Sequence, residues 1–309
     1  MQQKNDLPVI LVTGATGAQG SSAAQALLES GRWTVRCLTR NADSSGARAL
    51  QLAGAILVEG DLGDKSSLLK AMEGCYGVFG LTNFWEHYEK EYQQGKNLID
   101  AAHASGVSHF IYSGLPAYQL LSGGQLSVPH CDIKAALEVY ARSLGIPSTF
   151  THIAFYYENF LTFFPPRKGE DGAFYFGFPQ GDTPLAMATP EDMGAIVSLI
   201  FDHPDIYIGK TMGVVGEDRT CKEYAAIMSR VLGVTVRYRY IPRDEYARQG
   251  FPGAEELANM FEVQRLYIPH RKGDLMNSWY MNPRMQSFEL WLRRNKVKFL
   301  QLLNEKEYA

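Results

Sequence analysis

Three glycines spaced three residues apart are the residues in this sequence best suited to binding chemistry. Gly14, Gly17 and Gly20 lie between an apolar run at 8–13 and an Ala/Leu-rich stretch at 21–30. Glycine in such a turn lets the backbone approach a phosphate, and the N-terminus of the following helix offers N–H donors and a positive dipole end. We therefore expect a dinucleotide pyrophosphate here, with a purely structural turn as the alternative. The other residues of this loop are Ala15, Thr16, Ala18 and Gln19.

The residues after the second predicted strand indicate which dinucleotide binds. An Asp or Glu at that position would accept hydrogen bonds from a ribose 2′-hydroxyl, but this chain carries Arg40 and Asn41. A charge-assisted bond from a guanidinium to a 2′-phosphate contributes about 1.5–3 kcal/mol, which is a preference of about ten- to a hundredfold. The sequence therefore favours NADP over NAD, unless Arg40 is only a surface residue at a strand end.

Two further groups of residues follow predicted strands. Asp61 and Leu62 come after the third strand, where we expect the adenine, and Thr82, Asn83 and Phe84 come after the fourth, where we expect the nicotinamide. Open α/β sheets bind their ligands at the carboxyl ends of the strands. All of these positions are therefore expected to line one groove.

The elements that must position these residues alternate along the first half of the chain. Short apolar, β-branched runs predict strands at 8–13, 34–38, 55–59, 77–81, 109–113 and 148–153. Stretches ending in glycine predict helices between them at 21–30, 89–105 and 132–144. This order predicts an α/β fold, a Rossmann-type doubly wound parallel sheet.

A smaller α+β subdomain is expected after this sheet. The segment 155–188 is rich in Phe, Tyr, Pro and Gly, which predicts loops and short strands with exposed aromatic side chains. Thr189 and Pro190 are typical of the start of a helix, and a strand is expected at 211–215. We predict a first domain at 1–154, re-entered at about 189–215, and a second at 155–309, mainly 155–188 and 216–309. Its expected helices are 221–232, 244–248, 254–267 and 283–295.

Composition excludes several classes of protein. The net charge of −3 provides no overall attraction for nucleic acid or anionic lipid, and 46% hydrophobic residues are enough for a large core. The four cysteines include no C-x-x-C pair, so no metal site is expected. No apolar run reaches the length of a membrane span, and the first residues are polar. We expect a cytoplasmic protein with reduced thiols, for which entry into the nucleus stays open.

The motifs taken together resemble those of the atypical short-chain dehydrogenases that include the NmrA-like proteins. The resemblance rests on residues 14–20, 112–115, the pair His130-x-x-x-Lys134, and 156–159. Two further stretches, 82–86 and 250–261, narrow it to NmrA-like family domain-containing proteins. The resemblance extends essentially from end to end and implies an NADP-binding protein of the redox-sensor type.

The resemblance also locates the place where catalysis would occur. Active relatives use a Tyr-x-x-x-Lys pair on one helix face, in which Lys holds the nicotinamide ribose and Tyr transfers a proton. Here Lys134 is kept but His130 replaces the Tyr. His130 either titrates near neutral pH or only lines the pocket. Ser113 stands where these enzymes orient a substrate. Cys131, next to His130 in the sequence, is a weaker candidate for a redox sensor.

A last motif follows the sixth predicted strand. The resemblance places Tyr156, Tyr157, Glu158 and Asn159 at the nicotinamide end of the groove. The aromatic run that follows either closes over the cofactor or forms the core of the second subdomain.

Three functions follow from these observations. An intact cofactor loop without the catalytic Tyr favours an NADP(H)-responsive regulator, not an enzyme, whose conformation, association as a homodimer or choice of protein partner follows cofactor occupancy. The alternative is an NADPH-dependent reductase of a quinone, aldehyde or other small carbonyl compound. Nucleic-acid binding is the weakest reading. It would use the basic residues of the expected last helix, Arg293, Arg294, Lys296 and Lys298.

Overall fold

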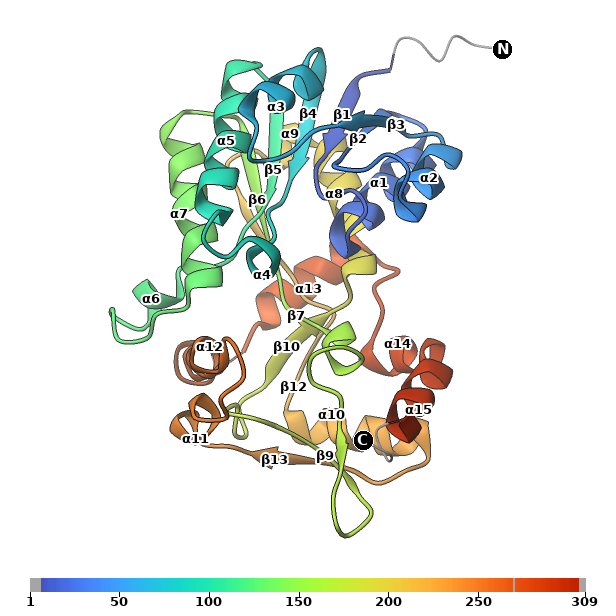
Figure 1. Ribbon diagram of the computed structural model, residues 1–309, viewed down its shortest axis with the longest axis vertical. Helices are drawn as coiled ribbons and strands as arrows, with labels where there is room; N and C mark the ends of the chain where they lie inside the picture. Colours follow the sequence, from blue (N-terminus) through green and yellow to red (C-terminus); the bar gives the residue numbers. More distant parts are fainter. Residues whose placement is uncertain (1–6, 269, 306–309) are drawn as a thin grey trace. The chain divides into compact units, whose positions relative to one another are not determined.

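The computed structural model describes residues 7–268 and 270–305 and divides the chain into two compact units (Figure 1). Unit 1 comprises Met1–Ala117, His130–Ile153 and Pro190–Met212. Unit 2 comprises Tyr118–Pro129, Ala154–Thr189 and Gly213–Ala309. The predicted division puts 118–129 in the first domain, whereas this segment groups with unit 2 in the structure.

A parallel sheet with β4 as its central strand organises unit 1. Its strands lie in the order β11-β6-β5-β4-β1-β2-β3, which is the predicted Rossmann-type arrangement. Ile10, Leu11 and Val12 on β1 are fully buried, as expected for a strand covered on both faces. The strands are β1 Val9–Val12, β2 Thr34–Thr39, β3 Ile56–Glu59, β4 Cys75–Gly80, β5 His109–Ser113, β6 Ser148–Ile153 and β11 Thr211–Val214.

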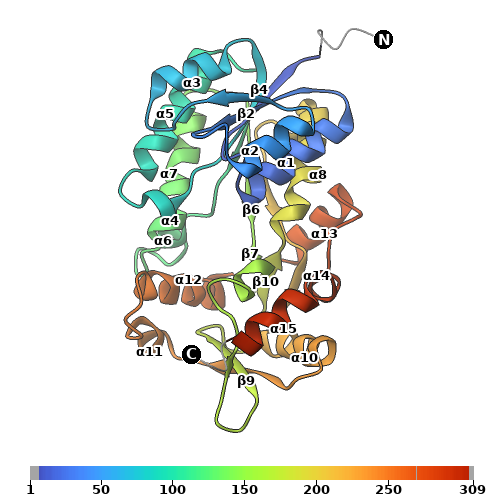
Figure 2. The ribbon, with the colours of Figure 1, turned by 45° about the vertical axis from the view of Figure 1, so that its right-hand side comes forward.

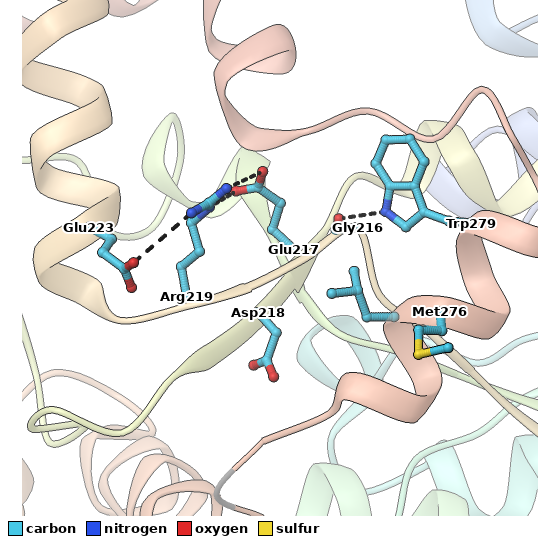
Figure 3. A pocket seen from close by; sticks show the side chains of 8 residues that line it. Gly216, Glu217, Asp218, Arg219, Glu223, Met276 and Trp279 are labelled. Atoms are coloured by element: carbon cyan, nitrogen blue, oxygen red, sulfur yellow. Dashed lines mark hydrogen bonds and ion pairs between the residues drawn. The ribbon is translucent and has the colours of Figure 1, made fainter.

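Helices cover both faces of this sheet (Figure 2). On one face, Leu68, Leu98 and Leu137 from α3, α5 and α7 share a core with Phe110 and Phe150 of the sheet. On the other face α1 packs against α8. The helices are α1 Ala18–Ser30, α2 Ser45–Leu52, α3 Lys65–Met72, α4 Phe84–His87, α5 Glu91–Ala104, α7 Pro129–Ser143, α8 Met193–Asp202 and α9 Pro204–Tyr207.

The helix predicted to open at Thr189 starts later than expected. Residues Pro190–Asp192 form a short 3-10 turn, and α8 begins at Met193. The Thr189 hydroxyl donates to Glu158 Oε1 at 2.7 Å. Because Glu158 is remote in sequence, capping rules that consider only neighbouring residues do not reveal that it binds the Thr189 hydroxyl.

One histidine is buried inside the sheet. The Thr149 hydroxyl donates to the Tyr207 carbonyl at 2.8 Å, so the His109 Nε2–H donates to Thr149 Oγ1, also at 2.8 Å. His109 Nδ1 has no hydrogen-bond partner among the described residues. Burial lowers the pKa of His109 from 6.5 to about 4, so the ring is neutral at physiological pH.

Unit 2 is built from two three-stranded sheets and several helices, which is the expected α+β architecture. The sheets have the orders β12-β10-β7 and β13-β9-β8. The strands are β7 Phe155–Tyr156, β8 Arg167–Lys168, β9 Phe174–Phe178, β10 Leu185–Ala188, β12 Glu217–Arg219 and β13 Val236–Tyr240. The helices are α6 Tyr118–Leu121, α10 Cys221–Leu232, α11 Arg243–Ala247, α12 Ala254–Tyr267, α13 Lys272–Met281, α14 Phe288–Arg294 and α15 Lys296–Glu305, with a 3-10 turn at Tyr157–Phe160.

Aromatic side chains form much of the interior of unit 2. Phe178 stacks on Phe261 with ring centroids 4.5 Å apart, and Phe160 packs on Phe176 and Phe288. The prediction of exposed aromatics in this segment was therefore wrong for most of them, because alternate residues of β9 point inward. Phe163 is an exception and is 71% exposed.

The predicted helix at 283–295 is shorter than expected and is followed by another. Ser287 accepts a hydrogen bond from the Leu290 N–H and caps α14, so the residues before it are not helical. Arg293 and Arg294 lie on α14, whereas Lys296 and Lys298 lie on α15. Arg293 pairs with Glu289 at 2.6 Å, so the basic group is partly neutralised.

All four cysteines are buried, and burial raises the pKa of Cys37 to about 12 and raises those of Cys75 and Cys221. Cys131 is 2% exposed, which leaves little access for an oxidant and weighs against its role as a sensor.

Two other features can be assessed over the described part of the chain. No helix there is long and apolar enough to cross a membrane. Within those residues, no group of three or more His, Cys, Asp or Glu side chains is arranged to hold a metal ion.

Candidate functional site

The glycine loop joins β1 to α1 in a conformation that requires glycine. Gly14 has φ of 55°, in the left-handed region. A Cβ on Gly20 would lie 2.1 Å from the Gly14 carbonyl oxygen, so any larger residue there would displace the turn. The loop therefore holds the helix against the strand end as closely as the backbone permits.

The N-terminus of α1 is suited to an anion. Its N-cap is Gly17, which has no side chain to accept from the first N–H groups, and the first turn contains no acidic residue. These donors and the helix dipole favour negative charge at this point. A phosphate group therefore fits the loop as the sequence predicts.

Arg40 and Asn41 follow β2 at the same edge of the sheet. Arg40 donates to Glu86 Oε1 of α4 at 2.6 Å, and the side chains of this pair are 55% and 44% exposed. Asn41 Oδ1 accepts from the Asp43 N–H at 2.9 Å, so its side chain shapes the turn. Arg40 is thus a solvent-accessible cation already placed opposite an anion.

Asp61 and Leu62 follow β3. Asp61 Oδ1 accepts from the Gly63 N–H at 2.6 Å, and the Leu62 carbonyl accepts from Asn97 at 3.0 Å. Both residues shape the loop after the strand. Their expected contact with an adenine stays a prediction.

Lys134 is the centre of a buried polar cluster. Its ammonium donates to the Thr82 carbonyl at 3.0 Å, to Thr82 Oγ1 at 2.9 Å and to Glu91 Oε1 at 2.5 Å. Glu91 is fully buried, and Lys134 is 12% exposed. An ammonium has three N–H donors, so the three contacts use all of them.

Thr82 and Tyr112 extend this cluster. The Thr82 hydroxyl donates to Glu91 Oε1 at 2.6 Å, so the Tyr112 hydroxyl, 3.1 Å away, is the donor to Thr82. Burial, with the charges of Glu91 and Glu138, raises the pKa of Tyr112 well above its usual range. A fully buried phenol held in this way does not replace the missing Tyr of the Tyr-x-x-x-Lys pair.

His130 lies on α7 one turn before Lys134. Its ring packs at 5.8 Å from Phe84 and 5.3 Å from Trp85, both on α4, and it is 8% exposed. Asn83, at the N-cap of α4, donates to Glu86 at 3.2 Å. His130 is therefore held among aromatic rings, which agrees with the pocket-lining interpretation.

Ser113, at the end of β5, contacts the glycine loop. Its hydroxyl donates to Gln19 Oε1 at 2.8 Å. The structure thus brings Ser113 next to the first turn of α1, while Lys134 contacts Thr82 at the end of β4. The predicted loop residues of unit 1 follow the carboxyl ends of β1, β2, β3 and β4, and Lys134 reaches this edge of the sheet through Thr82.

Tyr156, Tyr157, Glu158 and Asn159 belong to unit 2. Tyr157 is buried and donates to the Gln286 carbonyl at 3.2 Å, and Glu158 Oε1 accepts from Trp291 at 2.9 Å. The Asn159 carbonyl accepts from the Phe164 N–H at 2.8 Å. These contacts stabilise unit 2, and the expected role in cofactor binding stays a prediction.

Sequence reasoning missed two acidic residues of this region. Glu86 and Glu91 lie in a segment rich in charged and polar residues, WEHYEKEYQQGK, which is typical of a solvent-exposed stretch. The available signals were the place of Glu86 in the motif 82–86 and of Glu91 a few residues beyond it, after the predicted nicotinamide-side residues 82–84.

A doubly wound parallel sheet, a glycine turn between β1 and α1, and a lysine of α7 that contacts the loop after β4 are typical of an atypical short-chain dehydrogenase/reductase. The chain belongs to the NmrA-like family, whose profile matches residues 7–278. It is 33% identical over 277 residues to the NmrA-like family domain-containing oxidoreductase FrzB of Cladobotryum sp, covering 82% of each chain. An NmrA-like family domain-containing protein of Dictyostelium discoideum is 30% identical over 77% of this chain and 82% of its own.

Solved structures confirm the fold. The negative transcriptional regulator NmrA superposes with a TM-score of 0.82 at 24% identity, covering 98% of each chain. The NADPH-dependent quinone oxidoreductase QOR2 of Escherichia coli has a TM-score of 0.75 at 22% identity, covering 93% of this chain and 99% of its own.

Proposed function

We propose that this protein is an NADP(H)-binding, redox-sensing regulator. The observation that carries the proposal is the combination of an uncapped α1 N-terminus behind the glycine loop with Arg40 at the end of β2. The loop would hold the pyrophosphate, Arg40 the 2′-phosphate, and Lys134 the ribose of the nicotinamide. Structures of NmrA with NAD and with NADP support this choice of ligand.

The replacement of the catalytic Tyr by His130 supports regulation over catalysis. His130 occupies the Tyr position and packs against the rings of Phe84 and Trp85. A sensor needs cofactor forms that bind its conformations with different affinities. We propose that cofactor occupancy changes homodimer association or the choice of a protein partner.

A titration with NADPH and NADP tests this function directly. Association state is followed by light scattering, and nucleotide turnover is followed in the same samples. The expected result is tight binding with a change in association or partner binding and no turnover. Tight binding that leaves conformation, association and partner binding unchanged would refute the regulatory role.

A second candidate is an NADPH-dependent reductase of a quinone, an aldehyde or another small carbonyl compound. Lys134 of α7 is kept and contacts Thr82 just after β4, and relatives such as FrzB are named oxidoreductases. NADPH bound there would supply a hydride. Loss of absorbance at the reduced-nicotinamide band with a panel of such acceptors, abolished by Lys134→Ala, would favour this function over regulation.

A further inference from the structure

A carboxylate of the chain itself already contacts the arginine that is proposed to hold the 2′-phosphate. Glu86 Oε1 lies 2.6 Å from the Arg40 guanidinium, and Glu86 Oε2 accepts from Asn83 at 3.2 Å. The Asn83 contact orients the carboxylate at the N-terminal end of α4. The hydrogen bond from Asn83 therefore holds the Glu86 carboxylate in position to contact Arg40.

Carboxylates and phosphates use the same guanidinium donors. Both anions accept parallel N–H bonds from arginine, so they are alternative partners for one side chain. A 2′-phosphate that binds Arg40 must displace Glu86 or share its donors at close range with a like charge. NAD has no phosphate at this position and meets no such competition.

We propose that Glu86 is a specificity-determining residue, which competes with the 2′-phosphate for Arg40 and so lowers affinity for NADP without lowering affinity for NAD. This inference rests on the proposed function, because it requires NADP to bind at Arg40. It adds that the chain itself limits how tightly NADP is held, which suits a protein that must respond to changes in NADP(H) concentration.

The expected size of the effect follows from the exposure of the pair. Its side chains are 55% and 44% exposed, and accessible ion pairs of this kind are weak and screened by salt. Glu86→Gln keeps the shape of the side chain and an acceptor for Asn83 but removes the charge. NADP affinity is expected to rise about two- to fivefold at low ionic strength, and by less at high ionic strength.

Calorimetric titration of the full chain with NADP, NAD and 2′,5′-ADP tests the proposal. The matched control is Glu89→Gln, which removes an equal charge from the same segment but not from the pair with Arg40. We expect Glu86→Gln to bind NADP and 2′,5′-ADP more tightly, NAD affinity to stay unchanged, and Glu89→Gln to behave like the wild type. Because Glu86 is on the surface, the variant is expected to fold normally.

The outcomes separate this inference from the function on which it rests. If the wild type binds NADP and Glu86→Gln binds it equally well, Glu86 is not a competitor and the inference alone is wrong. An equal gain for NADP and NAD would also overturn it, because only NADP carries the 2′-phosphate. If no variant binds either dinucleotide, the proposed function and this inference both fail.

Discussion

Replacing Lys134 by Met tests whether the Lys134–Glu91 pair is as buried and as essential as its geometry indicates. Glu91 is fully buried and Lys134 is 12% exposed, so the variant leaves a buried carboxylate whose remaining described donor is the Thr82 hydroxyl. Removing one partner of a buried ion pair costs about 3–5 kcal/mol. For a domain of about 150–250 residues this lowers the Tm by about 6–20 °C.

Thermal unfolding at pH 7, followed by circular dichroism, measures the effect. The double variant Glu91→Gln/Lys134→Met removes both charges and keeps an acceptor for Thr82, so it is expected to recover at least half of the lost stability. The control Lys96→Met breaks the more exposed pair with Asp100 and should leave the Tm nearly unchanged. A single Lys134→Met variant that melts within about 2 °C of the wild type would refute the reasoning.

Three other predictions concern cofactor choice, pH and the glycine turn. Arg40→Ala should weaken NADP binding about ten- to a hundredfold and leave NAD binding unchanged in calorimetric titrations. Burial lowers the pKa of His109 from 6.5 to about 4. The contribution of the neutral ring to the free energy of unfolding is therefore complete above pH 6.5 and is lost as the pH falls towards 4. Urea unfolding of the wild type should show a free energy of unfolding about 3 kcal/mol lower near pH 4 than above pH 6.5, and His109→Gln should not show this loss. Gly20→Ala forces a Cβ against the Gly14 carbonyl and should abolish dinucleotide binding, as measured by the same titrations.

The sheet of unit 1 could be predicted because its signals are local. The run 8–13 is continuously apolar or β-branched, 148–153 is rich in such residues, and glycines follow the helices between them. The start of α8 could not be predicted in the same way. Thr189 has the residue type of an N-cap, but its hydroxyl donates to Glu158, which is brought near only by the fold of unit 2.

The candidate site was predictable where backbone geometry decides the residue type, and not where tertiary pairing does. Gly14 and Gly20 are required by a turn that any strand-to-helix phosphate loop needs. Nothing in the sequence around Glu91 predicts that it is buried, because an acidic residue is typical of a solvent-exposed helix start. The approach of Lys134 from α7, together with the Thr82 hydroxyl, makes the complete burial of Glu91 tolerable.

Burial of the four cysteines turns them into reporters of transient opening. A thiol must reach water and ionise before it reacts with an alkylating reagent, so buried thiols react only when the surrounding structure opens. Cys37, Cys75 and Cys131 belong to unit 1, whereas Cys221 belongs to unit 2. The alkylation rate at each position, read by mass spectrometry of peptides, therefore gives the opening equilibrium of each unit separately and in the presence or absence of nucleotide.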